Sequence, residues 1–78
     1  MTTPELFALI EEALEVPSGT IAAGTMIADV KEWDSLSWLT IMALLDERTD
    51  VTLTWEEIDS VKQVSDLETI LRSRSVVA

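Results

Sequence analysis

The sequence contains neither cysteine nor histidine. Without cysteine the chain can form no disulfide and offers no thiolate to a metal ion, which fits a reducing compartment. Without histidine it lacks the usual general base, and the two absences together exclude most zinc sites. No D-x-D-x-D-G calcium loop is present, and a hydrolase with paired carboxylates would need a cleft that so short a chain does not readily build. We therefore do not expect an enzyme or a bound metal.

Basic residues are also scarce. Five Lys and Arg stand against fifteen Asp and Glu, which gives a formal net charge of −10. Nucleic acids and anionic membrane surfaces select Lys and Arg, so neither is an expected partner. A small acidic domain suits basic patches on other proteins, where charge accelerates encounter. The alternative that acidity serves only solubility stays open, and repulsion between like charges favours a monomer.

The sequence also lacks a long apolar run. The opening MTTPELFALIEEALEV has no basic region and carries glutamates within its apolar stretch, unlike a secretory signal. No segment approaches the roughly 20 apolar residues of a membrane span. We expect a cytoplasmic protein with one domain over residues 1–78, since this length leaves no room for a second. Its free energy of unfolding should be modest, about 4–10 kcal/mol.

Apolar residues recur at helical spacing in four segments, which predicts an all-α fold with helices over residues 3–15, 35–48, 55–61 and 65–73. In the first segment Glu11, Glu12 and Glu15 are expected on the polar side. Thr54 with Glu57, and Ser65 with Glu68, match capping boxes that begin the last two helices. The residues after the last helix are expected to fray.

Residues 16–33 form a long connection, which is uncommon in a compact domain and usually functional. It leads to a helix that is apolar nearly all round. One side carries Trp38, Ile41, Met42 and Leu45, and another stripe carries Leu36, Leu39 and Ala43. A domain this thin can hardly bury both stripes, so we expect the second to contact a partner.

Ser35 stands where this helix begins, inside Asp34-Ser35-Leu36. Backbone N–H groups at a helix N-terminus are unpaired and the helix dipole is positive there, so a phosphodiester on this hydroxyl would be held favourably. Ser and Asp are also the preferred N-caps, so Asp34 or Ser35 could serve only to cap the helix. This local pattern alone does not decide between the two roles.

The pattern over roughly residues 4–72 resembles the acyl carrier protein family, of the stand-alone bacterial kind. The resemblance rests on Asp34-Ser35-Leu36 about 30 residues after the first helix begins, the apolar helix that follows, the acidic Asp46-Glu47, the short third helix and the net acidity. It implies a four-helix bundle of the acyl-carrier type with a short third helix and a long first loop. It also implies that Ser35 receives a 4′-phosphopantetheine arm from coenzyme A, delivered by a phosphopantetheinyl transferase.

On this resemblance the arm's thiol holds acyl or aminoacyl groups as thioesters, in fatty acid, polyketide or related biosynthesis. Asp34 is then the acid beside the modified serine, with capping as its expected role. Leu36, Leu39 and Ala43 would be apolar contacts for acyl- or aminoacyl-loading and acyl-transfer enzymes. The acidic residues Asp46, Glu47 and Asp50 would meet basic docking patches on those enzymes.

Several positions depart from typical fatty-acid carriers. Val30-Lys31-Glu32-Trp33 replaces a segment that usually contains glycine, Ser37 and Thr40 stand where acids are common, and Arg48 interrupts the acidic run. These departures favour a specialised carrier for polyketide, lipid-modification or aminoacyl chemistry. Because Trp38 and Met42 are bulky, we hypothesise a short or polar cargo. The competing interpretation is a small acidic helical adaptor with no prosthetic group.

Overall fold

The computed structural model describes residues 1–77, and in that range the chain folds into four α-helices and one short 3-10 helix. In chain order these are α1 Thr3–Leu14, the 3-10 helix η1 Ile27–Asp29, α2 Ser35–Thr49, α3 Trp55–Ser60 and α4 Val64–Ser73. Each predicted helix is confirmed with bounds that differ by no more than one residue at either end, whereas η1 was not predicted. The β-pairing in residues 1–77 is limited to an isolated bridge between Met26 and Gln63.

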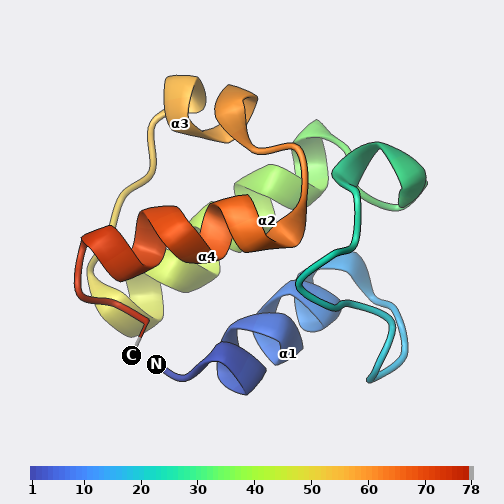
Figure 1. Ribbon diagram of the computed structural model, residues 1–78, viewed down its shortest axis with the longest axis horizontal. Coiled ribbons are helices and arrows are strands. Elements are labelled where there is room, and N and C mark those ends of the chain that lie inside the picture. Colours follow the sequence, from blue (N-terminus) through green and yellow to red (C-terminus); the bar gives the residue numbers. More distant parts are fainter. Residues whose placement is uncertain (78) are drawn as a thin grey trace.

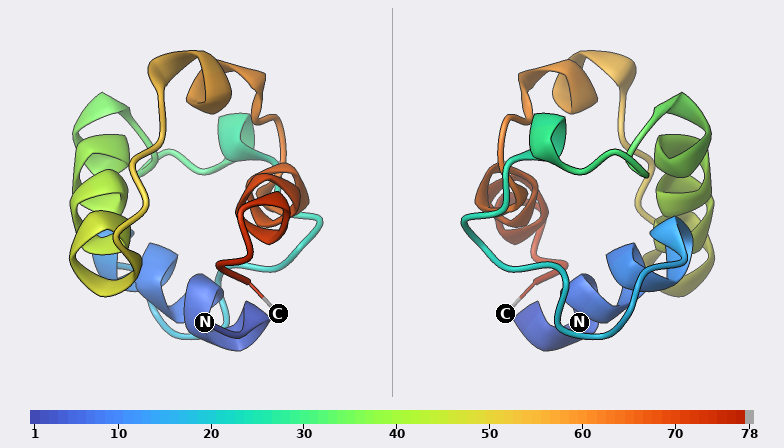
Figure 2. Two further views of the ribbon diagram at one scale, coloured as in Figure 1. Left: turned by 90° about the vertical axis from the view of Figure 1, so that its left-hand side faces the viewer. Right: turned by 90° about the vertical axis from the view of Figure 1, so that its right-hand side faces the viewer.

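The helices surround one interior (Figures 1 and 2). A single cluster of buried apolar side chains fills it. The side views show α2 and α4 on opposite sides, α1 along the bottom and α3 across the top. The fully buried large side chains come from α1, α2 and α4, namely Leu6, Leu9, Ile10, Ile41, Leu45, Val64, Leu67 and Leu71. Each such side chain contributes roughly 1.5–3 kcal/mol by leaving water. No helix within residues 1–77 has the length and apolar character needed to cross a membrane.

Helix α1 begins with a capping box and ends in a left-handed residue. Thr2 and Glu5 satisfy each other's backbone N–H groups at the start. Glu15 terminates the helix with φ 57° and ψ 44°, and its N–H bonds back to the carbonyls of Glu11 and Glu12. A non-glycine residue in this conformation costs roughly 1–2 kcal/mol. The end of α1 is therefore well defined but carries backbone strain.

This strain predicts that Glu15→Gly stabilises the protein. Glycine adopts positive φ without a Cβ clash, but it also gives the unfolded chain more freedom, so we expect a net gain of about 0.5–1 kcal/mol. Urea unfolding would measure it. Glu12→Gly, placed inside the helix, is the matched control and should destabilise by a comparable amount. Destabilisation by Glu15→Gly would contradict the strain assignment.

Glu11 is buried, and its expected place on the polar side of α1 is wrong. Its side chain is only 6% exposed. One carboxylate oxygen accepts hydrogen bonds from the backbone N–H groups of Gly19 at 2.8 Å and Ile21 at 3.0 Å. Glu12 and Glu15 are exposed as expected. A charged group at the end of α1 thus fixes the first turn of the long connection.

The rest of that connection is held along the start of α4. The N–H groups of Val64 and Ser65 donate to the carbonyls of Thr25 and Ala23, each at 2.9 Å. The Ile27 N–H donates to the carbonyl of Lys62 at the same distance. The views of Figure 2 show the segment passing outside α4 before it reaches α2. Backbone hydrogen bonds, together with the partly buried side chains of Ile27 and Val30, therefore position the approach to Ser35.

Two expectations about the C-terminal part are wrong. Ser65 and Glu68 form no capping box, because α4 begins one residue earlier and Asp66 accepts the N–H groups of Lys62 and Gln63. Glu68 is instead buried and accepts hydrogen bonds from Thr3 on α1 and Arg72 on α4. The predicted fraying is wrong up to Val77, which is 3% exposed and belongs to the core.

Hydrogen bonds from Arg74, the residue after α4, hold the loop before α3 in place. Arg74 donates to the carbonyl of Thr52 at 2.8 Å and to the carboxylate of Glu57 at 2.5 Å. The predicted Thr54 and Glu57 capping box is present at the start of α3. Helix α3 has only 6 residues and a single buried side chain, Ile58. Its position therefore depends on these caps and on Arg74 as well as on packing.

Candidate functional site

Ser35 is the first residue of α2, and its side chain is exposed. Asp34 is the N-cap, and its Oδ1 accepts the backbone N–H of Ser37 at 2.9 Å. No hydrogen bond within residues 1–77 engages the Ser35 hydroxyl. The alternative in which Ser35 caps the helix is therefore wrong. The cap leaves the Ser35 oxygen free at the positive end of a helix of 15 residues.

The turn that leads into Ser35 is fixed on two sides. The Ser37 hydroxyl donates to the carbonyl of Glu32 at 2.7 Å, and the Trp33 N–H donates to the carbonyl of Val30 at 3.1 Å. The Trp33 ring is buried and packs against Trp38, with ring centroids 5.1 Å apart and planes tilted by 53°. The exposed hydroxyl is thus attached to a backbone that polar and apolar contacts hold in place.

Asp34 has a lowered pKa because its carboxylate accepts the backbone N–H of Ser37. A carboxyl group whose pKa is lower in the folded chain stabilises the fold above its unfolded pKa. That contribution is lost as the pH falls through the folded pKa. For Asp34 the window lies at and below the ordinary value of 3.8.

We expect an NMR titration of the side-chain carboxyl carbon of Asp34 to give a midpoint below 3.8. The midpoint is lowered because hydrogen bonds to the charged carboxylate favour its ionisation. Ser37→Ala is the matched comparison, because it keeps the backbone N–H that Asp34 accepts and removes only a hydroxyl that donates to the carbonyl of Glu32. Its midpoint should also lie below 3.8. A midpoint at or above the ordinary value would contradict the capping geometry.

Helix α2 has one buried side and one apolar stripe in solvent. Trp38, Ile41 and Leu45 are buried. On the other side Leu36 is 72% exposed and Leu39 is 50% exposed, and Ala43 is exposed as well. The expectation that α2 cannot bury both stripes is confirmed. The exposed stripe begins next to Ser35, so a protein that docks there would also face the hydroxyl.

The three acidic residues expected to meet basic patches on partner enzymes are all exposed near the C-terminal end of α2, and we call them the acidic rim. Asp46 and Glu47 lie in its last turns, and Asp50 follows as the C-cap with φ 57°. Arg48 does not neutralise them within the helix. It points toward α1, where it pairs with Glu12 at 2.9 Å. The rim therefore keeps its negative charge along the solvent side of α2.

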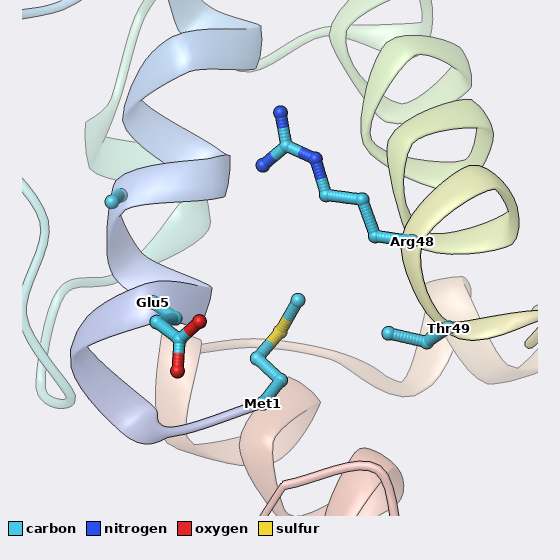
Figure 3. A pocket seen from close by; sticks show the side chains of 5 residues that line it. Met1, Glu5, Arg48 and Thr49 are labelled. Atoms are coloured by element: carbon cyan, nitrogen blue, oxygen red, sulfur yellow. The ribbon is translucent and has the colours of Figure 1, made fainter.

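A pocket lies between α1 and the C-terminal end of α2, but it is distant from Ser35. Its lining residues are Met1, Glu5, Ala8, Arg48 and Thr49 (Figure 3). Thr49 is 14 residues after Ser35 on one straight helix, which separates the two by about 20 Å. Among residues 1–77, no group of three or more acidic side chains is arranged to hold a metal ion. Neither feature adds to the chemistry at Ser35.

The structure separates the three tryptophans. Trp33 and Trp38 are 7% and 8% exposed, so both belong to the core. Trp38 thus lies on the buried side of α2, opposite the stripe that was expected to stay exposed. Trp55, the first residue of α3, is 49% exposed. The polar and apolar residues around Trp33 follow neither a helical nor a strand periodicity. The sequence therefore does not indicate whether the Trp33 side chain is buried or exposed.

The fold is similar to that of a solved carrier protein. Scans against protein-family models and curated proteins find no match. A search of solved structures finds the solution NMR structure of the holo acyl carrier protein from Geobacter metallireducens, with a TM-score of 0.75 and 22% sequence identity, over 88% of this chain and 79% of that chain. This chain therefore has the acyl-carrier fold, as expected from the resemblance.

Proposed function

We propose that the chain is a carrier protein that is modified at Ser35 by 4′-phosphopantetheine. The observation that carries the proposal is the exposed Ser35 hydroxyl, free of hydrogen bonds within residues 1–77, at the first position of α2 in an acyl-carrier fold. The neighbour of this fold is described as a holo acyl carrier protein. The cofactor suits the site, because an unpartnered hydroxyl at a helix N-terminus can take a phosphodiester that the helix dipole favours.

The attachment needs an external catalyst and no base from this chain. The Ser35 oxygen attacks the pyrophosphate of coenzyme A at the phosphorus that bears pantetheine. A new oxygen–phosphorus bond forms, the pyrophosphate bond breaks, and adenosine 3′,5′-bisphosphate leaves. The hydroxyl proton passes to the phosphopantetheinyl transferase or to water. The absence of histidine is therefore no obstacle. When attached, the arm supplies a thiol that holds acyl or aminoacyl groups as thioesters.

The exposed side of α2 is the proposed surface for partner enzymes. Leu36, Leu39 and Ala43 provide apolar contact beside the arm's root. Asp46, Glu47 and Asp50 provide negative charge for basic patches on loading and acyl-transfer enzymes. Exposed ion pairs of this kind contribute under about 1 kcal/mol each and act mainly on association rate and specificity. The net charge of −10 supports the same class of partner and favours a monomer. We also propose a cytoplasmic location.

The bulk of the interior beside α2 supports a short or polar cargo. Trp33 and Trp38 occupy the core next to the arm's root, and Met42 is partly buried in it. Loading with a long acyl chain and recording NMR shifts would test this part of the proposal. Large shifts at Met42, Ile58 and Val61 would contradict it, because they would place a long chain inside the bundle.

A second candidate function uses the same exposed surface of α2 but no phosphopantetheine arm. The exposed stripe of Leu36 and Leu39 would serve an acidic helical adaptor equally well. Incubation with coenzyme A and a broad-specificity phosphopantetheinyl transferase, followed by intact mass measurement, separates the two. A carrier gains the mass of one phosphopantetheine group. An unchanged mass, with a known carrier modified in the same mixture, favours the adaptor and rejects the carrier.

A further inference from the structure

The indole N–H of Trp33 is buried and has no hydrogen-bond partner. Within residues 1–77 it is the one buried side-chain nitrogen or oxygen left in this state. An unsatisfied buried donor costs about 1–3 kcal/mol, and such groups are rare in native proteins. Phenylalanine would fill an aromatic site here without that cost. An acceptor that arrives from outside the folded chain would satisfy this donor.

The position of Trp33 limits what that acceptor can be. Trp33 lies two residues before Ser35, so their Cα atoms are within about 7 Å of each other. Any group tethered to the Ser35 hydroxyl is consequently held beside this donor at high local concentration. A free ligand would have to compete with it from bulk solution. The tethered group is the nearest mobile source of an acceptor.

The surroundings also select the chemistry of the acceptor. An indole N–H is a donor only. The chain is strongly acidic, and Glu32 and Asp34 flank Trp33 directly, so burying a carboxylate beside the indole is unfavourable. The Trp38 ring on one side is apolar. A neutral carbonyl oxygen satisfies the donor without bringing charge into the core.

The approach to Trp33 is lightly packed. No residue from Ala22 to Glu32 is fully buried, although Ile27 and Val30 pack against the core as partly buried side chains. The segment is held instead by backbone hydrogen bonds such as the one from Ile27 to Lys62. Segments with few buried apolar contacts open at low free-energy cost.

Building on the proposed function, we propose that the Trp33 indole N–H donates a hydrogen bond to a carbonyl oxygen of the group tethered to Ser35. The carbonyl can belong to an amide of the arm, to the thioester, or to a polar carbonyl of the cargo. In each case Trp33 retains the tethered group against α2 between visits to partner enzymes. If the acceptor is a carbonyl of the cargo, a carrier with this donor discriminates in favour of oxygenated cargo over plain hydrocarbon chains.

The test follows the three indole N–H signals of the chain, one for each tryptophan, by NMR on protein labelled with nitrogen-15 tryptophan. Trp55→Phe and Trp38→Phe assign two signals, and the remaining one is Trp33. The transferase then prepares four states of the full chain: unmodified, carrying the free-thiol arm, and carrying butyryl or acetoacetyl thioesters transferred from the corresponding coenzyme A derivatives. Intact mass confirms each state.

We expect the Trp33 proton signal to move downfield and to exchange more slowly with solvent in at least one modified state. Movement with the free-thiol arm identifies an arm amide, movement that begins with butyryl identifies the thioester, and movement confined to acetoacetyl identifies the cargo carbonyl. An unmoved Trp33 signal in all modified states, or equal movement of the Trp38 signal, overturns the inference. Failure of the mass gain would instead reject the proposed function itself.

Discussion

Replacing Ser35 by alanine is expected to abolish the gain of phosphopantetheine completely. The modification forms a bond to the Ser35 oxygen, so no other change in the chain can substitute for its loss. The fold should remain, because Asp34 and not Ser35 caps α2. An exposed substitution without a capping role changes the free energy of unfolding by no more than about 0.5 kcal/mol. Intact mass measures the first effect and urea unfolding the second.

Ser37→Ala is the matched control for this result. Ser37 lies in the same first turn of α2, but its hydroxyl already donates to the carbonyl of Glu32. This variant should gain phosphopantetheine as the natural sequence does. Two outcomes would sink the assignment of the site: a mass gain that survives in Ser35→Ala, or a gain lost equally in both variants. Either would move the attachment point away from Ser35.

Glu11→Ala is expected to destabilise the protein by about 2–4 kcal/mol, since two hydrogen bonds to a charged acceptor are lost and a buried N–H is left unpaired. The affected donors are the N–H groups of Gly19 and Ile21. For a domain whose total is about 4–10 kcal/mol, this is a large fraction. Urea unfolding at neutral pH measures the loss.

Two comparisons make the Glu11 prediction specific. Glu12→Ala removes an exposed ion pair with Arg48 and should cost under about 1 kcal/mol. Glu11→Gln keeps an oxygen acceptor without the charge and should fall between the two. The folded fraction of Glu11→Ala should still be modified at Ser35, because the substitution acts on the start of the long connection. Equal stability of Glu11→Ala and Glu12→Ala would contradict the buried role.

The sequence predicts the helices well because their determinants are local. Apolar spacing and the Thr54–Glu57 box act within one or two turns, and both appear in the structure. The errors concern residues whose roles depend on distant segments. Glu68 receives a hydrogen bond from Thr3, which is 65 positions away. A contact between such distant residues produces no local sequence pattern. The spacing of Ser65 and Glu68 therefore predicts a capping box that the structure does not contain.

The candidate site divides in the same way. The Asp34-Ser35-Leu36 pattern places a hydroxyl at the helix start from local sequence alone. Which of the two polar residues takes the cap is decided by the backbone of Asp34, which is extended at φ −123° and ψ −170°. The burial of Trp33 depends on its tertiary contact with Trp38, which an aperiodic loop sequence does not encode locally. The exposed Leu36 and Leu39 stripe follows from size, because so few elements cannot cover both sides of α2.

The placement of the chain ends has a practical consequence for using this protein. Met1 shares a pocket with Thr49 at the end of α2, and the last residues return to the same pole, where Arg74 contacts Thr52 (Figures 1 and 3). Ser35 lies at the opposite pole, about 20 Å away along the helix. An affinity tag, a fused enzyme or a surface attachment at either terminus would therefore leave the serine facing outward and open to a modifying enzyme.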